Sequence, residues 1–566
     1  VGGFVISRGP LAELVPIENA AMPERSVIQW DKDDLEALGL LKVDVLALGM
    51  LSAIRRALQM IGKQMHEVPA EDAEVYGMIQ KADTIGVFQI ESRAQMSMLP
   101  RLQPREFYDL VVQVAIVRPG PIQGGMVHPY LQARERRRQW QRTKREEPFP
   151  IEYPELDNAL RRTLGVPIFQ EQVMQIAIDG AGFSAGQADE LRRSMAAWRR
   201  KGEVHRFEKP FKDGLLANGY PPEFADRLFQ QILGFGEYGF PESHAYSFAL
   251  LAYASSWLKR HEPACFLAAL LNAQPLGFYT PAQLVQDARR HGVRVLPIDV
   301  ATSDVDCTLE EPLAPVAGVS LAQPAVRLGL RLVAGLGAAA AERLVQARGS
   351  GPFVNSEDLA LRARLDRQDL QALAAADALR ALAGHRRQQM WDAAAQLRAP
   401  PLLQDAPVHE AAPQLPAAPE GEDILWDYAA TGLTLRRHPL ALLREKLQRW
   451  RLATAQQLQS APHGRRVRAC GIVTVRQRPG SANGTMFVTL EDETGSVNVI
   501  VWPARLERWR SALLRSRLLA VEGVWQCARA PGADTAVRHL VGERFKDLTP
   551  LLGLLEQALD GSRDFH

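Results

Sequence analysis

Cysteine is scarce in this sequence of 566 residues, which contains only Cys265, Cys307, Cys470 and Cys527. These residues are far apart and form no CxxC pair, so we expect neither a zinc site nor a disulfide framework. A chain with so few cysteines fits a reducing compartment. We therefore expect a cytoplasmic protein.

Long hydrophobic runs and a strong net charge are also missing. No stretch of about 18 uninterrupted apolar residues occurs, so we expect no transmembrane helix and no membrane partner. The first seven residues have no basic lead-in, and we expect no signal peptide. Lys and Arg number 67 against 65 Asp and Glu, which leaves a net charge of +2. Composition therefore does not predict a nucleic-acid partner, and only the distribution of basic residues can do so.

The length of the chain allows three or four domains. The sequence begins at Val1 rather than Met and enters an apolar, strand-like run at once, so we expect a chain that was cut within a domain. A processed N-terminus is the alternative. Residues 39–46 (GLLKVDVL) then predict a buried strand that presents polar groups at one end.

Residues 49 to about 300 have a mostly helical pattern. Apolar positions recur every three or four residues at 50–61 and 170–179, and residues 248–259 fit a further helix. Glycine and proline clusters separate these segments. The pattern predicts a large α-rich domain.

A smaller unit follows this domain. The tripeptide GLG at 335–337 opens a predicted helix through Arg348, which indicates a helix-hairpin-helix. Such a turn points backbone N–H groups at a DNA phosphate, aided by the helix N-terminus. We therefore select Gly335, Gly337 and Arg343 as candidates for DNA binding. Residues 396–422 are rich in Pro and Ala without periodicity and predict a linker.

Residues 465–548 change to short segments of strand-like period. We expect strands at 467–475, 486–490, 497–502 and 518–526, with turns between them. Short strands at this spacing indicate a small β-barrel.

Several sequence blocks, taken together, resemble the bacterial DNA polymerases of family C, the alpha-subunit type. The blocks are GLLKVDVLAL at 39–48, VFQIESR at 87–93, IVRPGPIQ at 116–123, GVPIFQEQVM at 165–174, DELRRSM at 189–195 and FGEYGFPESHAYS at 235–247. The resemblance covers nearly the whole chain. The ending SRDFH at 562–566 resembles that of the error-prone branch of this family.

The resemblance implies a multidomain α+β fold. Its expected parts are the end of a polymerase palm (1–48), fingers (49–305), a helix-hairpin-helix region (306–395), a linker with connecting helices (396–462), an OB-fold barrel (463–548) and a C-terminal tail (549–566). The run FVTLEDETGSV at 487–497 resembles a frequent OB signature. OB-folds bind single strands through basic grooves and stacking aromatics.

For the barrel we select Arg466, Arg468 and Arg476 as DNA-binding residues. Phe487 and Trp502 either stack on bases or belong to the core.

The resemblance also implies template-directed transfer of dNTPs to a primer 3′ end. It places Asp44 on the palm strand as a metal-binding and catalytic carboxylate for a two-ion Mg²⁺ site, with Lys42 beside it. Carboxylate oxygens suit this hard cation. The other two aspartates of the family triad are expected upstream of Val1, so this chain by itself is not expected to assemble the whole metal site.

The nucleotide-binding candidates come from the fingers blocks. Arg118 is the first residue of a rigid Arg-Pro-Gly-Pro segment that holds it for phosphate binding, and Gln123 follows the segment; a turn with a solvated Arg118 is the alternative. Arg193 and Lys201 lie in a basic segment that either grips a triphosphate or is a solvated face. His244 and Tyr246 either shape the nucleotide pocket or are structural. In the structural reading, Ser243 caps the following helix.

The stretch 134–145 holds seven basic residues and resembles an insertion relative to the family. It is either a disordered, solvated loop or a contact to the DNA backbone, where Lys and Arg gain from counterion release.

The partners implied by the resemblance are primer–template DNA, dNTPs, the sliding clamp and a Y-family-like accessory protein. The error-prone branch implies translesion synthesis in the damage response. Two alternatives remain open. One is the replicative DNA polymerase III alpha subunit, and the other is a non-catalytic DNA-binding module.

Overall fold

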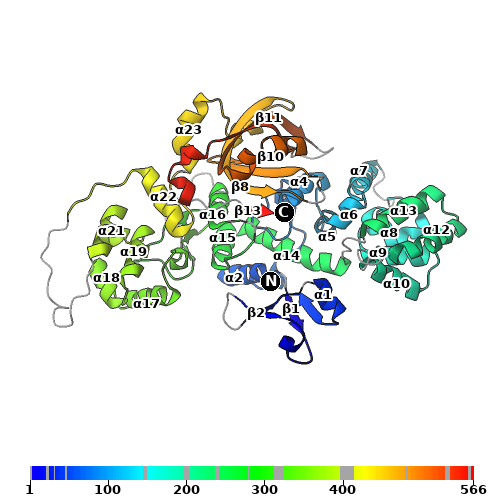
Figure 1. The fold of residues 1–566 in the computed structure, drawn as a ribbon, viewed down its shortest axis with the longest axis horizontal. Helices are drawn as coiled ribbons and strands as arrows, with labels where there is room; N and C mark the ends of the chain where they lie inside the picture. The colour runs from blue at the N-terminus through cyan, green and yellow to red at the C-terminus, as the bar shows by residue number, and fades with distance from the viewer. Residues whose placement is uncertain are drawn as a thin grey trace.

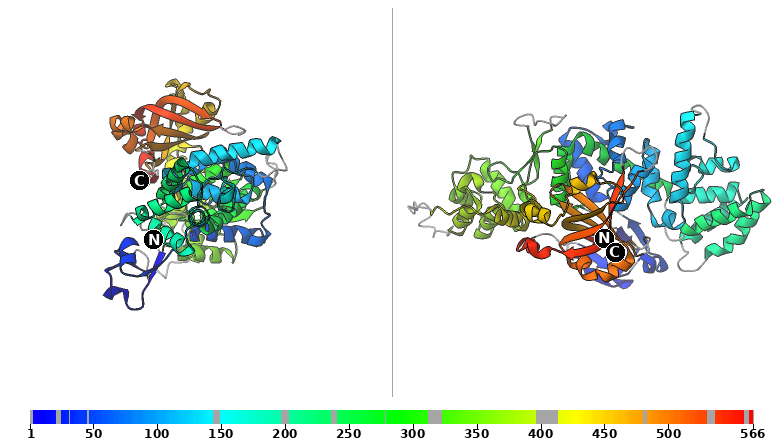
Figure 2. Two further views of the ribbon diagram at one scale, coloured as in Figure 1. Left: turned by 90° about the vertical axis from the view of Figure 1, so that its right-hand side faces the viewer. Right: turned by 90° about the horizontal axis from the view of Figure 1, so that it is seen from above.

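The computed structural model describes most of the chain. The described residues are 3–20, 25–30, 32–44, 47–143, 149–196, 203–235, 241–277, 279–311, 323–395, 413–479, 482, 484–529, 536–558 and 563–565. A central helical body separates the N-terminal strands from a C-terminal β-barrel, and two helical lobes extend to either side of the body (Figures 1 and 2).

The N-terminal part forms two small ladders. β1 (Gly3–Ile6) pairs antiparallel with β4 (Leu41–Asp44), and β2 (Ile17–Asn19) pairs with β3 (Ser26–Ile28). The predicted strand is present, but the prediction that it is buried is wrong, because Leu41 is 61% exposed and Val43 40%. The ladder has only two strands, so it cannot cover its own apolar side chains.

The central body is built from helices with wide apolar faces. They are α2 (Leu48–Met60), α3 (Ala73–Gln80), α4 (Arg93–Leu102), α5 (Phe107–Ile116), α14 (Glu242–His261), α15 (Pro263–Asn272) and α16 (Pro281–Arg290). In α15, every residue from Ala264 to Asn272 is buried. A helix that is apolar on all sides belongs in the interior of a domain, so α15 lies at the centre of this body.

Two of the helices were predicted from periodicity with different bounds. α2 covers the segment expected at 50–61, and α14 includes the one expected at 248–259. α14 begins six residues earlier, at Glu242, directly after Pro241. Ser243 therefore lies inside the first turn and does not cap the helix, contrary to one of the two readings of this block.

The lobe at the right of Figure 1 contains α7 to α13. Its bounds are α7 (Val127–Thr143), α8 (Asp157–Leu160), α9 (Gln170–Asp179), α10 (Ala185–Ala196), α12 (Glu208–Ala217) and α13 (Pro222–Phe235). α9 has the bounds that its periodicity predicts. The basic stretch from residue 134 is helical through Thr143, so the expectation of a disordered loop is wrong there, and residues 144 and 145 lie outside the described residues.

The opposite lobe carries the predicted hairpin. α17 (Ala338–Arg348) follows Gly337 as expected, and α18 (Ser356–Arg362), α19 (Arg367–Ala375), α20 (Arg380–Ala383) and α21 (Arg386–Ala395) complete the lobe. The segment expected as a linker, 396–422, overlaps the start of α22 (Glu420–Thr431). Residues 396–412 lie outside the described residues.

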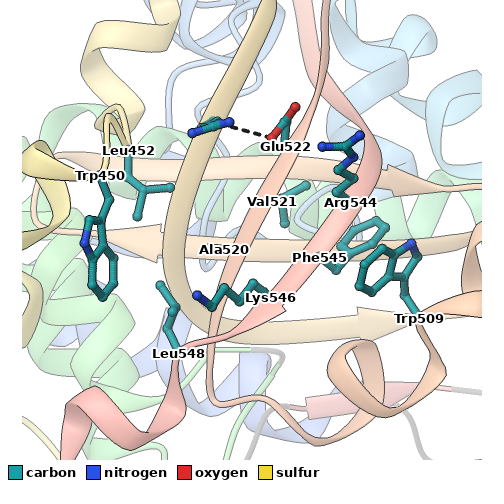
Figure 3. Close-up of a pocket in the computed structure, with 11 residues that line it drawn as sticks. Trp450, Leu452, Trp509, Ala520, Val521, Glu522, Arg544, Phe545, Lys546 and Leu548 are labelled. Carbon is teal, nitrogen blue, oxygen red and sulfur yellow. Dashed lines mark hydrogen bonds and ion pairs between the residues drawn. The ribbon is translucent and has the colours of Figure 1, made fainter.

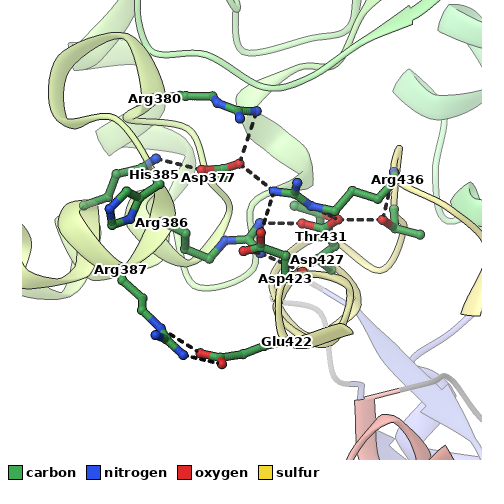
Figure 4. A network of polar contacts seen from close by, with 12 residues as sticks. Asp377, Arg380, His385, Arg386, Arg387, Glu422, Asp423, Asp427, Thr431 and Arg436 are labelled. Carbon is green, nitrogen blue, oxygen red and sulfur yellow. Dashed lines mark hydrogen bonds and ion pairs between the residues drawn. The ribbon is translucent and has the colours of Figure 1, made fainter. Parts of the chain in front are cut away.

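A polar network joins this lobe to α22 (Figure 4). Arg386 of α21 is buried and contacts both Asp423 and Asp427 of α22. Arg436 reaches Asp377 at 3.0 Å and both of the same carboxylates. Buried charges of opposite sign that satisfy one another in this way hold two elements in one geometry.

The C-terminal barrel has the strand order β8-β9-β10-β12-β11, and β11 pairs back with β8 to close it. The bounds are β8 (Arg466–Gln477), β9 (Met486–Asp492), β10 (Gly495–Val501), β11 (Leu518–Ala528) and β12 (Val537–Asp547). The predicted strands are confirmed, but β12 was missed. Within the expected tail, β13 (Arg563–Phe565) pairs parallel with β8.

In the part of the chain that the structure describes, no helix combines the length and the apolar character needed to cross a membrane.

Candidate nucleotide and DNA sites

The first turn of α14 is in contact with the block at 87–93. The His244 ring lies 4.1 Å from that of Phe248, and Phe248 packs edge-on against Phe88 at 5.1 Å. The backbone N–H of Phe88 donates to the Ser255 hydroxyl on the same helix, at 3.2 Å. The fold therefore brings together two sequence blocks that are about 150 residues apart.

Arg118 joins this cluster through Gln89. Its Nη2 lies 2.8 Å from Oε1 of Gln89, and its Nε is 3.4 Å from the carbonyl oxygen of Val114. Arg118 is the N-terminal cap residue of α6 (Pro119–Gln123), and proline at the first helical position fixes the backbone there. The guanidinium is thus held beside Gln89, the neighbour of Phe88, which packs on α14. The side chain of Gln123 lies outside the described residues.

Tyr246 lies among two other aromatic side chains. Its ring is 5.5 Å from Phe107 and 6.0 Å from Tyr108, and 41% of the residue is exposed. The Tyr108 hydroxyl donates to Glu242 at 2.8 Å. Burial raises the pKa of Tyr108, and this hydrogen bond to Glu242 raises it further, so Tyr108 stays a neutral donor.

Arg193 lies on α10, in the lobe of helices α7 to α13. Its Nη2 contacts Asp189 at 2.8 Å, and its side chain is 73% exposed. Hydrogen bonding from Arg192 lowers the pKa of Asp189, with Arg193 contributing charge. Arg193 therefore presents a cation to solvent next to a paired carboxylate. Lys201 lies outside the described residues.

The palm-strand candidates lie on the exposed two-stranded ladder. Asp44 is the last residue of β4 and faces Gly3 across the ladder, and its side chain lies outside the described residues. Lys42 faces Val5 and is exposed. The ladder places both residues on one short strand at the edge of the helical body.

A second group of carboxylates was not anticipated from the sequence. Asp83, Asp287 and His291 offer atoms within 4.8 Å of one another, a spacing that suits a metal ion. Lys259 already lies between them, 2.6 Å from Asp287 and 3.4 Å from Asp83.

Burial opposes ionisation of Asp83, but the hydrogen bond from His291 and the ammonium of Lys259 outweigh it and lower the pKa of Asp83 to about 2. The hydrogen bond to Asp83 raises the pKa of His291. This cluster is therefore an ion network that Lys259 neutralises.

The helix-hairpin-helix candidates fall into two groups. Gly335 has φ +87°, a backbone conformation that side chains disfavour, and Gly337 precedes α17 with an ordinary φ of −70°. Gly337 is the N-cap residue of α17 and Gly335 lies two residues before it, next to a helix start, where the first backbone N–H groups lack the bonds of a continuing helix. Arg343, whose side chain is 40% exposed, donates to the carbonyl oxygens of Ala363 and Arg364 at 3.1 and 3.2 Å. Its contacts hold the hairpin together.

Of the barrel candidates, two are on the surface and one is not. Arg466 and Arg468 have side chains that are 60% and 51% exposed, and both contact Glu522. Arg476 is only 6% exposed, and its guanidinium donates to the carbonyl oxygens of Leu513, at 2.7 Å, and Ser516. The expectation that Arg476 contacts DNA is therefore corrected, because it satisfies the end of α26 (Arg510–Arg515) inside the domain.

The barrel docks on the helical body through the outer face of β9. Arg93 of α4 donates from Nε to the Thr489 hydroxyl at 3.0 Å, and Thr489 is 3% exposed. Glu491, on the same face of β9, has a side chain that is 15% exposed. Burial raises its pKa, against the charges of Arg290 and Arg93. Sequence patterns contained no signal for this docking, since its partners are nearly 400 residues apart.

Sequence reasoning also missed Trp450, Trp509, Arg544 and Lys546, which line a pocket on the barrel (Figure 3). Arg544 and Lys546 lie on the strand that was not predicted. The alternation of side chains toward and away from the core along residues 537–547 was the available signal.

Comparison with known protein families matches four consecutive parts of the chain. Residues 1–47 match the "Bacterial DNA polymerase III alpha NTPase domain", and residues 50–219 the "Bacterial DNA polymerase III alpha subunit finger domain". Residues 292–389 match the "Helix-hairpin-helix motif" and residues 467–540 the "OB-fold nucleic acid binding domain". These matches support the expected order of domains, while the boundaries between them stay a prediction.

Curated relatives match along the whole chain. An error-prone DNA polymerase of Bordetella bronchiseptica is 61% identical over 576 residues, covering 100% of this chain and 53% of the relative. Those of Burkholderia pseudomallei and Alkalilimnicola ehrlichii are 59% and 57% identical, with 52% and 53% of the relative covered. The chain thus spans about half the length of the curated relatives it matches. Along its whole length the chain is similar to error-prone DNA polymerases, and residues 1–47 and 50–219 match domain models of the bacterial DNA polymerase III alpha subunit.

Proposed function

We propose that this chain is part of a DNA-directed DNA polymerase that adds dNTPs to a primer 3′ end in error-prone translesion synthesis. The main support is the convergence of the fingers blocks at the start of α14, where Arg118, Gln89, Phe88 and His244 form one connected cluster. The similarity to error-prone polymerases along the whole chain supports the damage-response role over replication.

In this proposal, the α14 cluster receives the incoming nucleotide. Arg118 supplies a planar cation for the phosphates, and its contact with Gln89 limits its motion before the nucleotide arrives. Gln123, Arg193, Lys201, His244 and Tyr246 complete the proposed nucleotide-binding set. Positioning and electrostatic stabilisation do most of the work in phosphoryl transfer, and these side chains supply both.

The proposed cofactor is Mg²⁺, held in part by Asp44 at the end of β4 with Lys42 on the same strand. Mg²⁺ usually takes one or two carboxylates together with substrate phosphates. β4 offers one candidate carboxylate at this place, and the other cluster, Asp83 with Asp287, is already neutralised by Lys259. The residues described here therefore do not make up a complete two-ion site, and we derive no step through the metal.

Primer–template DNA is the proposed macromolecular substrate. Gly335 and Gly337 offer the helix start of α17 to a phosphate, and Arg466 and Arg468 offer surface cations on the barrel. The sliding clamp and a Y-family-like accessory protein are proposed partners by analogy with the family. We place the protein in the cytoplasm on the same basis.

A second function is favoured by one observation, the single candidate carboxylate on β4. The isolated chain would then bind primer–template without extending it. The two functions are separated by primer extension with the 566 residues, Mg²⁺ and all four dNTPs, and by the same assay in a protein that spans the full length of the relatives.

We expect no extension by the isolated chain with DNA still bound. In the full-length protein we expect extension that Asp44→Ala abolishes while DNA binding is kept. Bypass of an abasic template would support the error-prone role over the replicative one. Extension that survives Asp44→Ala would contradict the assignment of Asp44.

A further inference from the structure

A pocket of the barrel lies on the side opposite to the docked face. It has a volume of about 530 Å³ and is bounded by β11, β12, Trp450 at the end of α23 (Pro439–Arg449), and Trp509. β9, which docks on the helical body, lies across the closed barrel from β11 and β12. This volume lies within the range of small-molecule and cofactor sites, about 300–1,000 Å³.

Aromatic rings form the two ends of the pocket. Figure 3 shows Trp450 at one end and Trp509 with Phe545 at the other, with Ala520 and Lys546 between them. Trp450 is 41% exposed, and it is flanked by Lys446 and Lys546, whose Nζ atoms lie 5.6 and 5.9 Å from its ring. The small side chain of Ala520 leaves room on the floor. A planar, polarisable ligand fits between such rings.

The charged groups around the pocket are mostly basic. Arg468, Arg544 and Lys546 line it, and Glu522 is the single acid among the lining residues. Glu522 is already engaged by Arg468, 3.1 Å away. The excess of basic over acidic lining residues favours an anionic ligand. Its charge would lie near the rim of the pocket and its planar part on the aromatic rings.

Part of the usual ligand face of an OB-fold is covered in this protein. OB-folds bind oligonucleotides across their second and third strands, which here are β9 and β10. Thr489 in the middle of β9 is 3% exposed and bonded to Arg93, and the neighbouring Glu491 is covered by the same helical body. The pocket on β11 and β12 is an aromatic and basic surface of the barrel, and none of its lining residues belongs to the helical body.

We propose that this pocket binds a nucleobase of single-stranded DNA, with the adjoining phosphates on Arg544 and Lys546. Trp450 stacks on the base. The ion pair of Arg468 and Glu522 forms the opposite wall of the pocket. This inference deepens the proposed function and rests on its DNA-binding part. It assigns the single strand to a face of the barrel that lies away from β9.

The test measures the affinity of the 566-residue chain for fluorescein-labelled oligo-dT of about 16 nucleotides, the upper site size of one OB-fold. We expect Trp450→Ala to weaken binding about tenfold, which corresponds to ~1.4 kcal/mol for one stacked base. Trp391→Ala is the matched control, because Trp391 is 50% exposed on α21, remote from the barrel. The Trp391→Ala variant should bind oligo-dT as tightly as the unsubstituted chain.

Two further measurements do not depend on that variant. Lys546→Glu should reduce the slope of log affinity against log salt by about 1, as expected for one lost phosphate contact. Oligo-dT carrying 5-iodouracil should crosslink, on irradiation, to the peptide that contains Trp450 or Trp509.

The outcomes separate this inference from the proposed function. A chain that binds neither oligo-dT nor primer–template contradicts both. Binding of primer–template with unchanged oligo-dT affinity in Trp450→Ala overturns the pocket alone, as does crosslinking to Trp502. Quenching of Trp450 fluorescence by poly-L-glutamate and not by oligo-dT also overturns it, and would identify the pocket as a site for an acidic protein segment.

Discussion

Arg134 and Asp109 form a buried, two-point ion pair. Nη1 and Nη2 of Arg134 each lie 2.5 Å from one carboxylate oxygen of Asp109, and the side chains are only 7% and 5% exposed. Arg134 also donates to the carbonyl oxygens of Leu102 and Gln103. This pair therefore joins α7 to the end of α4 and to α5, although Arg134 belongs to a stretch that its sequence marks as a basic surface.

Replacing Arg134 with Ala should be strongly destabilising. It leaves the Asp109 carboxylate buried without its cation, and breaking a buried pair in this way costs about 3–5 kcal/mol. We expect this loss in the free energy of unfolding measured by urea titration. Arg136→Ala on the exposed face of the same helix is the matched control and should change stability by less than about 0.5 kcal/mol. Equal effects of the two substitutions would contradict the structural role of Arg134.

The same logic applies to Lys259, which is 4% exposed by its side chain and neutralises Asp83 and Asp287. Lys259→Met should cost about 3–5 kcal/mol, because two carboxylates lose their shared cation. Arg260→Met, next to it on α14, removes a surface pair with Glu74 and should cost at most about 1 kcal/mol. Thermal unfolding measured at pH 7 compares the two. Since the ammonium fills the carboxylate cluster, EDTA should leave the unfolding temperature of the unsubstituted chain unchanged.

His438 should make stability depend on pH below neutrality. Burial lowers its pKa to about 4, from an ordinary value near 6.5. The unfolded chain therefore takes up a proton below pH 6.5 that the folded chain does not, and stability falls as the pH decreases from 6.5 toward 4. The expected loss from this group is about 2–3 kcal/mol between pH 6.5 and 4.5.

His438→Asn isolates that contribution. The Nδ1 of His438 accepts from the backbone N–H of Leu440 at the start of α23, and the Asn side chain can accept there as well. Urea titrations at pH 6.5 and 4.5 should show a smaller loss for His438→Asn than for the unsubstituted chain. An identical loss would mean that groups other than His438 control the acid response.

Local patterns in the sequence were sufficient for elements whose period is regular. α9 has the predicted bounds, because its buried residues Val173, Ile176 and Ala177 repeat at helical spacing. The strands β8 to β11 were also found from their pattern. β12 was missed, since Arg538, His539 and Gly542 weaken its apolar pattern and its strand character depends on its pairing with β11 and β10.

The roles of individual side chains were predicted less well, because they depend on partners far away in sequence. Arg476 is a basic residue but is buried, because its guanidinium donates hydrogen bonds to the carbonyl oxygens of Leu513 and Ser516. The sequence singled out Arg118, but its contact with Gln89, 29 residues earlier in the chain, could not be predicted from its own block. A charge pattern alone does not distinguish a surface cation from one that satisfies the interior.

The two glycines of the hairpin allow its fold and its DNA contact to be tested apart. Gly335 has φ +87°, and Gly335→Ala should cost about 1–2 kcal/mol of stability, because a side chain disfavours this conformation even though the nearest atom is 3.8 Å from the new Cβ. Gly337 has an ordinary φ, and nothing lies within 4 Å of an added Cβ. Gly337 is the N-cap residue of α17, where Ala is less favourable than Gly, so Gly337→Ala should cost about 0.5–1 kcal/mol.

The new methyl group at position 337 would nevertheless project into the open space at the start of α17, where the proposed function places a DNA phosphate. We therefore expect Gly337→Ala to weaken binding of primer–template by more than its small shift of the urea midpoint explains. Gly335→Ala should lower the urea midpoint. Its DNA affinity should fall only because a larger fraction of the protein is unfolded. If Gly337→Ala binds primer–template as tightly as the unsubstituted chain, the hairpin does not approach the phosphate closely, and DNA binding has to come from the barrel and the fingers.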